Sequence, residues 1–199
     1  MTRRVALVLA AGLAVSASMA DAQTFDFETT PAGTAVPLSI TSGGLTATFT
    51  SGAGFSVQPA FFSSALSGLV LRDDDPAVGS LTVAFSSPVT GILLNFATNS
   101  PLTPAGLTLE ARDGATVVGT VSVPGGVPPG FLFPEGLVSF TGPTFTSVVL
   151  SSSARDFAVD NLVLTAATAV IPEPGTLVLF GTGALLVGAS ALRRRRLPG

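Results

Sequence analysis

The chain of 199 residues contains no cysteine, histidine, tryptophan or tyrosine, and all nine of its basic residues are arginines. Without cysteine the protein has no disulfide framework and no thiolate nucleophile. Without histidine, catalysis by a Ser/His/Asp or Cys/His arrangement is excluded, and so is zinc binding of the usual type. Stability must therefore come from packing of the polypeptide, or from a bound ion.

Positive charge is scarce in the middle of the chain. Between residues 23 and 170, ten acidic residues face three arginines, which leaves a net charge of −7. A surface of this sign repels the phosphate backbone, so we expect no nucleic-acid partner.

The first 22 residues have the features of a helical secretory signal peptide. Arg3 and Arg4 precede an apolar stretch, residues 5–15, and small residues lead to Ala22. Cleavage after Ala22 is typical of such leaders, and it implies export through the Sec translocon. A single-pass anchor is the alternative, but the apolar stretch is shorter than the ~20 residues that a bilayer requires.

Residues 23–170 are long enough for one domain with its own core. Short segments of alternating polar and apolar residues, rich in β-branched residues and phenylalanine, are separated here by Gly, Pro, Ser and Asn. No segment shows the 3.6-residue period of a helix. The eight clearest strands are residues 24–28, 45–50, 80–86, 90–98, 107–112, 116–123, 145–152 and 157–165. The pattern predicts an all-β domain, an antiparallel β-sandwich.

The alternation also assigns strand faces. Leu81, Val83 and Phe85 share one face of their strand, and Phe25 and Phe27 share one face of the first strand. Because successive side chains of a strand point to opposite faces, we expect these residues in the core. Residues 124–134 are too rich in proline and glycine for a strand or helix, and predict a long loop.

One carboxylate interrupts an apolar row. In the segment FAVDNLVLT, residues 157–165, strict alternation places Asp160 on the same side as apolar residues such as Ala158 and Leu162. A buried charge needs a partner or a metal. Glu28, at the end of the first strand, is the candidate companion, since the terminal strands of sandwiches commonly lie side by side. Pairing with backbone amides or with a nearby arginine is the alternative.

The other carboxylates offer little chemistry. Glu28, Glu110 and Glu135 are of the type used in glycoside hydrolysis. Sugar subsites, however, generally need aromatic faces with polar edges, which tryptophan and tyrosine would supply. Three adjacent aspartates, residues 73–75, are a candidate for a hard cation, with a solvated turn as the alternative. We expect no enzymatic activity.

The C-terminal tail contains three features in a fixed order. Pro172, Glu173 and Pro174 come first, an uncharged run at residues 176–192 follows, and Arg193, Arg194, Arg195 and Arg196 close it. At ~1.5 Å per residue, 17 helical residues reach roughly 25 Å, short of a bilayer of about 30 Å but workable with snorkelling arginines. The run therefore predicts a transmembrane helix with its basic end in the cytoplasm.

Together these features, residues 171–196, closely resemble the PEP-CTERM sorting signal of Gram-negative bacteria, a tail also called the ice-binding protein C-terminal domain. The resemblance implies recognition by exosortase, a membrane-embedded cysteine transpeptidase, with cleavage near the PEP motif and transfer to the surface. The prolines would keep this segment extended, as a protease-type cleft requires. A permanent membrane anchor is the alternative.

The central domain resembles, more loosely, the jelly-roll domains that accompany this tail. The resemblance lies in FDFE at residues 25–28, in the F-x-x-P-V-x-G-I pattern at residues 85–92 and in FAVDNLVL at residues 157–164. Galactose-binding-like jelly rolls hold a structural calcium between carboxylates of their first and last strands. That resemblance implies calcium at Glu28 and Asp160.

The sequence thus predicts an exported β-sandwich with a PEP-CTERM tail, located in the inner membrane before processing and at the cell surface or outside the cell afterwards. The expected role is structural or adhesive, within exopolysaccharide-associated biofilm. The alternatives are a calcium-stabilised carbohydrate-binding module and a permanently anchored periplasmic binding protein.

Overall fold

The computed structural model describes residues 22–52, 54–60, 63–73, 79–99, 105–154 and 156–167. Its secondary structure in these ranges consists of strands. They are β1 (Ala22–Phe25), β2 (Leu38–Ser42), β3 (Leu45–Ser51), β4 (Phe55–Pro59), β5 (Leu69–Asp73), β6 (Ser80–Thr98), β7 (Gly106–Asp113), β8 (Thr116–Pro124), β9 (Glu135–Ser152) and β10 (Phe157–Ala166). The chain divides into two compact units, Met1–Ala167 and Thr168–Gly199. The predicted signal peptide and transmembrane helix lie outside the described residues.

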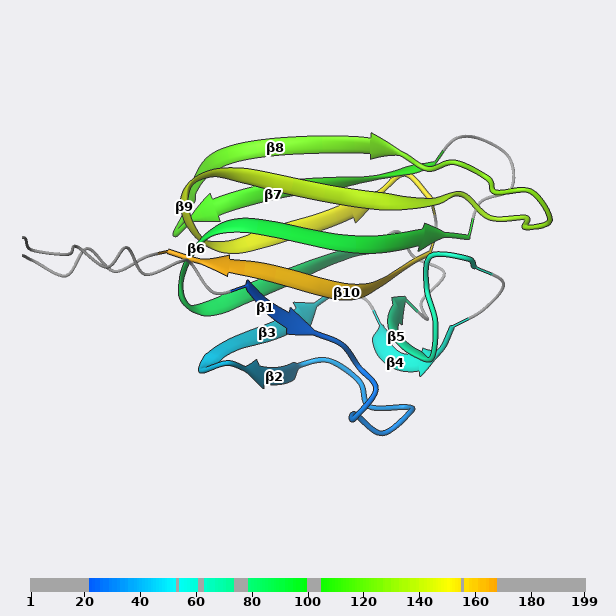
Figure 1. Ribbon diagram of the computed structural model, residues 1–199, viewed down its shortest axis with the longest axis horizontal. Coiled ribbons are helices and arrows are strands. Elements are labelled where there is room, and N and C mark those ends of the chain that lie inside the picture. Colours follow the sequence, from blue (N-terminus) through cyan, green and yellow to red (C-terminus); the bar gives the residue numbers. More distant parts are fainter. Residues whose placement is uncertain are drawn as a thin grey trace, which may run out of the picture. The chain divides into compact units, whose positions relative to one another are not determined.

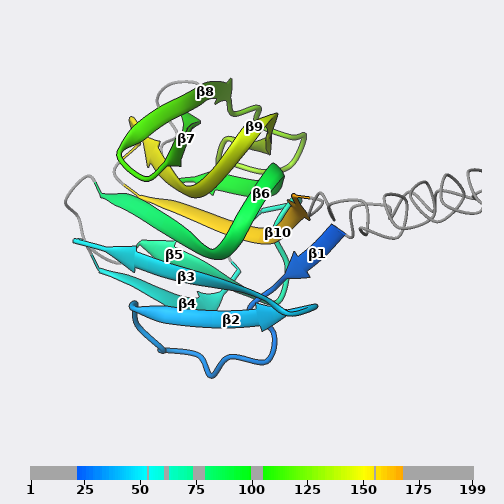
Figure 2. The same ribbon diagram turned by 90° about the vertical axis from the view of Figure 1, so that its left-hand side faces the viewer.

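Two long strands connect the layers of a sandwich (Figures 1 and 2). The first half of β6 pairs with β3 and with the second half of β9, whereas its second half pairs with β10 and with the first half of β9. One layer therefore runs β2-β3-β6-β9-β7-β8, and the other contains β9, β6, β10, β5, β4 and β1. The recorded strand pairings are antiparallel. The predicted class, an all-β antiparallel sandwich of jelly-roll type, is confirmed.

The two inner faces form the core. Leu81, Val83 and Phe85 are buried, as are Phe25 and Phe27, so both face assignments made from the alternation are confirmed. Phenylalanine rings meet edge to face within this core, as in the pair Phe27 and Phe49, whose ring centroids are 5.4 Å apart. Such geometry suits the positive edge and negative face of aromatic rings.

The sequence predicted two strands where the structure has the single strand β6. Proline lacks the backbone N–H and is tolerated in a strand at an edge or a bulge. The register of β6 against β9 shifts between Ala84 and Val89, the stretch that contains Pro88. The strand therefore continues past Pro88 by bending, and this bend carries it from one layer to the other.

Other strands were missed or cut short by the sequence pattern. β2, β4 and β5 have five residues each, and the first half of β9 precedes the predicted start at residue 145. The predicted first strand ends at Phe25 rather than at Glu28. The long loop was predicted correctly, since residues 125–134 form no strand and are tied to β9 by a bridge between Gly126 and Glu135.

A second, smaller apolar cluster lies outside the main core. It contains Leu66, Val70, Ala97 and Ala158, with Ala60 packed against it. Leu66 belongs to the segment between β4 and β5, so this segment covers the outer side of β10 and β6. The candidate site lies where that segment is held.

Candidate functional site

Asp160 is buried in β10, with 2% of its surface exposed. The prediction that Ala158, Asp160 and Leu162 share one side of the strand is wrong, however. Asn161 adopts a φ of 52° and the register shifts between Asp160 and Val163, so the alternation is interrupted there. Ala158 consequently joins the smaller cluster, whereas Leu162 packs in the main core. Asparagine is among the few residues that adopt this left-handed conformation at low cost.

Among the described residues, the recorded partners of the Asp160 carboxylate are hydrogen-bond donors. The backbone N–H of Asn161 donates to Oδ1 at 2.7 Å, the Asn161 amide donates to Oδ2 at 3.1 Å, and the Ser67 backbone donates as well. Burial raises the pKa of Asp160 to about 6 against these hydrogen bonds, and the charges of Glu28 and Asp26 add to the increase. The structure thus brings Glu28 and Asp160 close enough for their charges to interact, as the sequence predicted.

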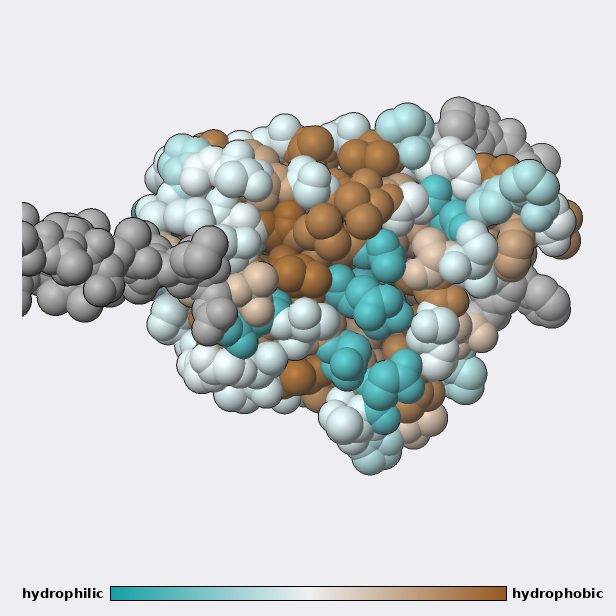
Figure 3. All heavy atoms as spheres, viewed as in Figure 1, coloured by the Kyte–Doolittle hydropathy of each residue, from teal (hydrophilic) through white to brown (hydrophobic). Residues whose placement is uncertain are grey.

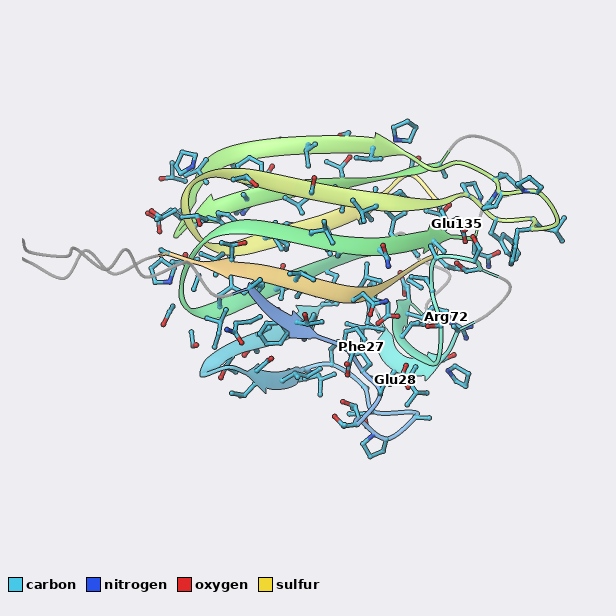
Figure 4. The ribbon with its side chains drawn as sticks, in the orientation of Figure 1. Phe27, Glu28, Arg72 and Glu135 are labelled. Atoms are coloured by element: carbon cyan, nitrogen blue, oxygen red, sulfur yellow. The ribbon has the colours of Figure 1, made fainter. Side chains whose placement is uncertain are left out.

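Glu28 also binds the segment between β4 and β5, two residues after the contact of Ser67 with Asp160. Its Oε1 accepts the backbone N–H of Leu69 at 3.1 Å. Gly68 makes this approach possible, because a Cβ there would lie 1.8 Å from Oε1 and because its φ of 65° suits glycine. Figure 4 shows both Glu28, in the segment that follows β1, and Glu135, at the start of β9.

Glu135, at the start of β9, is the third carboxylate on this segment. The hydroxyls of Ser63 and Ser64 donate to it, and the Ser64 backbone N–H donates to Oε2 at 2.8 Å. Burial raises the pKa of Glu135, but the hydrogen bonds outweigh it, so the pKa is lowered overall. We call residues 63–69 the clamped loop, since Glu135, Asp160 and Glu28 bind its backbone or hydroxyls in succession.

In the sequence, Glu135 stood out only as a carboxylate of the type used in catalysis, and this role was not predicted. Its partners lie about seventy residues away in the chain, and no local pattern connects them. Glu110 forms an ion pair with Arg112 on β7 instead. Asp73 is buried rather than solvated, and the other two aspartates of that run lie outside the described residues.

The calcium site predicted at Glu28 and Asp160 has too few protein ligands among the described side chains. Calcium takes six to eight oxygen ligands. Glu28 and Asp160 supply two carboxylates that already accept N–H groups, and the described ranges contain no group of three His, Cys, Asp or Glu residues placed to hold a metal. The remaining ligands would be backbone carbonyls and water. Calcium at Glu28 and Asp160 stays a prediction.

The sorting residues fall outside the described part of the chain. These are Pro172, Glu173, Pro174 and the four arginines at 193–196, together with the predicted helix at 176–192. Within the ranges that the structure describes, no helix is long and apolar enough to cross a membrane.

Comparison with known families identifies the tail. Residues 170–196 match the family model of the PEP-CTERM protein-sorting motif. The chain is thus an all-β sandwich protein with a sorting tail. It is a PEP-CTERM motif-containing protein, and the motif implies recognition by exosortase, export and passage through the membrane. No curated protein matches the chain.

Solved structures show only distant similarity. The K1 cleaved adhesin domain of Lys-gingipain from Porphyromonas gingivalis is 11% identical, with 74% of this chain and 99% of that chain covered and a TM-score of 0.48. The module CsCBM6-3 from Clostridium stercorarium, solved with cellobiose, is 22% identical, with 59% and 87% covered and a TM-score of 0.37.

Proposed function

We propose that this protein is an exported, non-catalytic component of the cell surface or extracellular matrix, with a structural or adhesive role in exopolysaccharide-associated biofilm. The observation that carries the proposal is the match of residues 170–196 to the PEP-CTERM protein-sorting motif. A tail of this kind delivers a protein to the surface, so the sandwich works there.

The residues of the tail suit that delivery. The two prolines, Pro172 and Pro174, lack backbone N–H groups and favour an extended chain, which would suit a protease-type cleft. Glu173 offers one charge for recognition by exosortase. The following helix would hold the chain in the inner membrane after Sec export, with the arginines on the cytoplasmic side.

A non-catalytic role is supported by the use of the buried carboxylates. Glu135 and Asp160 accept hydrogen bonds from the clamped loop and from Asn161. A general acid or base must instead lie within hydrogen-bond reach of a substrate proton. Since histidine and cysteine are absent from the chain, no other strong base or nucleophile pair takes their place.

The role is tested by deleting the gene in the native host and measuring floc and biofilm formation. We expect a loss of biofilm that the wild-type gene restores. A gene ending at residue 170 is the matched control, because it keeps the sandwich and removes the sorting tail, and we expect it not to restore biofilm. Unchanged biofilm after deletion would contradict the structural or adhesive role without touching the sorting motif.

A further inference from the structure

Exposed apolar side chains and charged side chains occupy different parts of this domain. In the described ranges the exposed large apolar side chains are those of Val117, Val127, Leu132 and Leu137. All four fall between residues 114 and 154, a stretch whose one charged residue is the buried Glu135. Figure 3 shows hydrophobic surface over β9 and β6, and hydrophilic surface in the region where Figure 4 labels Glu28. The apolar side chains are therefore exposed on a neutral part of an acidic domain.

The two most exposed of these side chains belong to the loop between β8 and β9, residues 125–134, which we call the apolar loop. Leu132 is 72% exposed and Val127 is 55% exposed. The sequence of the loop, GGVPPGFLFP, contains no charged side chain and none that donates or accepts a hydrogen bond. Exposed apolar surface of this kind is typical of sites that contact a membrane or another molecule.

The backbone of the apolar loop is also poor in free polar groups. Three of its ten residues are prolines, which have no N–H group. Gly126 and Glu135 exchange backbone hydrogen bonds at 2.9 and 2.8 Å, and Phe131 donates to the Pro128 carbonyl at 3.1 Å. Each unsatisfied backbone group in lipid carries a cost in free energy, so a loop with few free donors enters a membrane surface more easily than an ordinary loop.

The base of the apolar loop is fixed to the sandwich. The Pro134 carbonyl accepts the Thr98 backbone N–H at 2.8 Å, and Gly125 donates to the Ala105 carbonyl at 3.2 Å. Glu135, the residue after the loop, is bound by the serines of the clamped loop. Because the base is held in place, docking of the tip costs less conformational entropy than docking of an unattached loop.

The apolar loop lies at the end of the sandwich opposite the start of β1 and the end of β10 (Figure 1). In β6, Ala97 pairs with Glu135 on one side and with Ala158, near the start of β10, on the other. Ala166, at the end of β10, pairs instead with Val89. The tip of the loop is thus remote from the points where the chain enters and leaves the described domain.

We propose that the apolar loop inserts into a lipid surface with zwitterionic headgroups. Leu132 and Val127 enter the boundary between headgroups and acyl chains, where burial of their apolar surface is favourable. The acidic part of the domain stays in water. Since residues 23–170 carry a net charge of −7, anionic headgroups repel the domain, and zwitterionic lipid is the better partner.

Lipid fits the apolar loop better than a protein or a polysaccharide does. Protein interfaces contain about one hydrogen bond per 100–200 Å² of buried area. Polysaccharides present hydroxyl groups, whose loss of water must be compensated by new hydrogen bonds. The side chains of the apolar loop offer neither donors nor acceptors. Contact with hydrocarbon requires only the burial of apolar area, which this loop provides.

The absence of tryptophan from the chain makes the test direct. Leu132→Trp places a single tryptophan at the tip of the apolar loop, and Thr120→Trp, at an exposed position on β8, is the matched control. Both full-length variants are kept in discs of unbrominated lipid, which accommodate the predicted transmembrane helix. Vesicles of brominated phosphatidylcholine are then added, because bromine on the acyl chains quenches the emission of tryptophan that enters them.

We expect these vesicles to quench the emission of Leu132→Trp and to leave that of Thr120→Trp nearly unchanged. Adding Val127→Asp to Leu132→Trp should weaken vesicle binding about tenfold, because a carboxylate replaces an apolar side chain that is buried in lipid. Brominated phosphatidylglycerol should quench less at low salt than brominated phosphatidylcholine does.

Equal quenching of the two tryptophan variants, or no quenching of either, would overturn the insertion of the apolar loop. Binding unaffected by Val127→Asp would do the same, and stronger quenching by phosphatidylglycerol would overturn the choice of zwitterionic lipid. These outcomes do not depend on the biofilm role, which is tested separately by gene deletion.

Discussion

Glu135 is expected to contribute more to stability than any exposed acidic residue, because its carboxylate holds three donors of the clamped loop. These are the hydroxyls of Ser63 and Ser64 and the Ser64 backbone N–H. Hydrogen bonds to a charged group contribute about 1.5–3 kcal/mol each, and three at the low end amount to about 4.5 kcal/mol. The substitution also removes the cost of burying the Glu135 carboxylate, which offsets part of this loss. We therefore expect Glu135→Ala to lower the free energy of unfolding by about 3 kcal/mol.

Glu135→Gln tests the same reasoning without creating a cavity. The amide keeps one acceptor oxygen and the shape of the side chain, so we expect a smaller cost of about 1–2 kcal/mol. Glu110→Ala is the matched control. It removes a half-exposed carboxylate paired with Arg112, and such a pair is worth about 0–1 kcal/mol.

Urea unfolding of the full-length protein, followed by circular dichroism because tryptophan and tyrosine are absent, gives these free energies. The pKa of Glu135 is lowered in the folded protein, so its stabilisation is present above the ordinary value of 4.5 and is lost as the pH falls further. The cost of Glu135→Ala should shrink accordingly in acid. A cost no larger than that of Glu110→Ala at pH 7 would refute the clamp.

Three further predictions concern the same loop. The pKa of Asp160 is raised from 3.8 to about 6 in the folded protein, so the folded state binds more protons than the unfolded state in this range. With chelator present, the free energy of unfolding should therefore fall by up to about 3 kcal/mol as the pH rises from 3.8 to about 6. Urea titrations of Asp160→Asn should lack this fall, and an equal fall in the variant would count against the prediction. Gly68→Ala should cost more than Gly44→Ala, because both glycines have positive φ but only the first faces Glu28; equal melting temperatures would contradict this. If calcium binds at Glu28 and Asp160, calcium should raise the melting temperature of the wild type and not of Glu28→Gln, whereas indifference of the wild type to both calcium and chelator would remove the metal from the account.

Local patterns in the sequence were enough to predict which faces of the core strands are buried. The alternation around Val83 and Phe27 fixed which faces are buried, since a one-residue slip would have exposed every apolar side chain. The bend at Pro88 was not predictable in this way, because proline ends a strand or is absorbed by a bulge depending on its neighbours. The strand β2 was missed because its five residues, LSITS, give too short a pattern.

Only part of the candidate site could be predicted from the sequence. The proximity of Asp160 and Glu28 followed from the expected neighbourhood of the first and last strands. The left-handed conformation of Asn161 and the contact of Glu135 with Ser64 depend on packing between distant segments. Residue spacing and composition do not predict contacts of this kind, so the clamped loop could be identified only from the structure.

The most direct test of the central claim, that the tail addresses this sandwich to the cell surface, is the intact mass of the protein recovered from its native host. The wild type should begin at Gln23 and end near Pro174, whereas Glu173→Ala should keep Arg193, Arg194, Arg195 and Arg196. Arginines retained in both proteins would contradict processing and make the tail a permanent anchor.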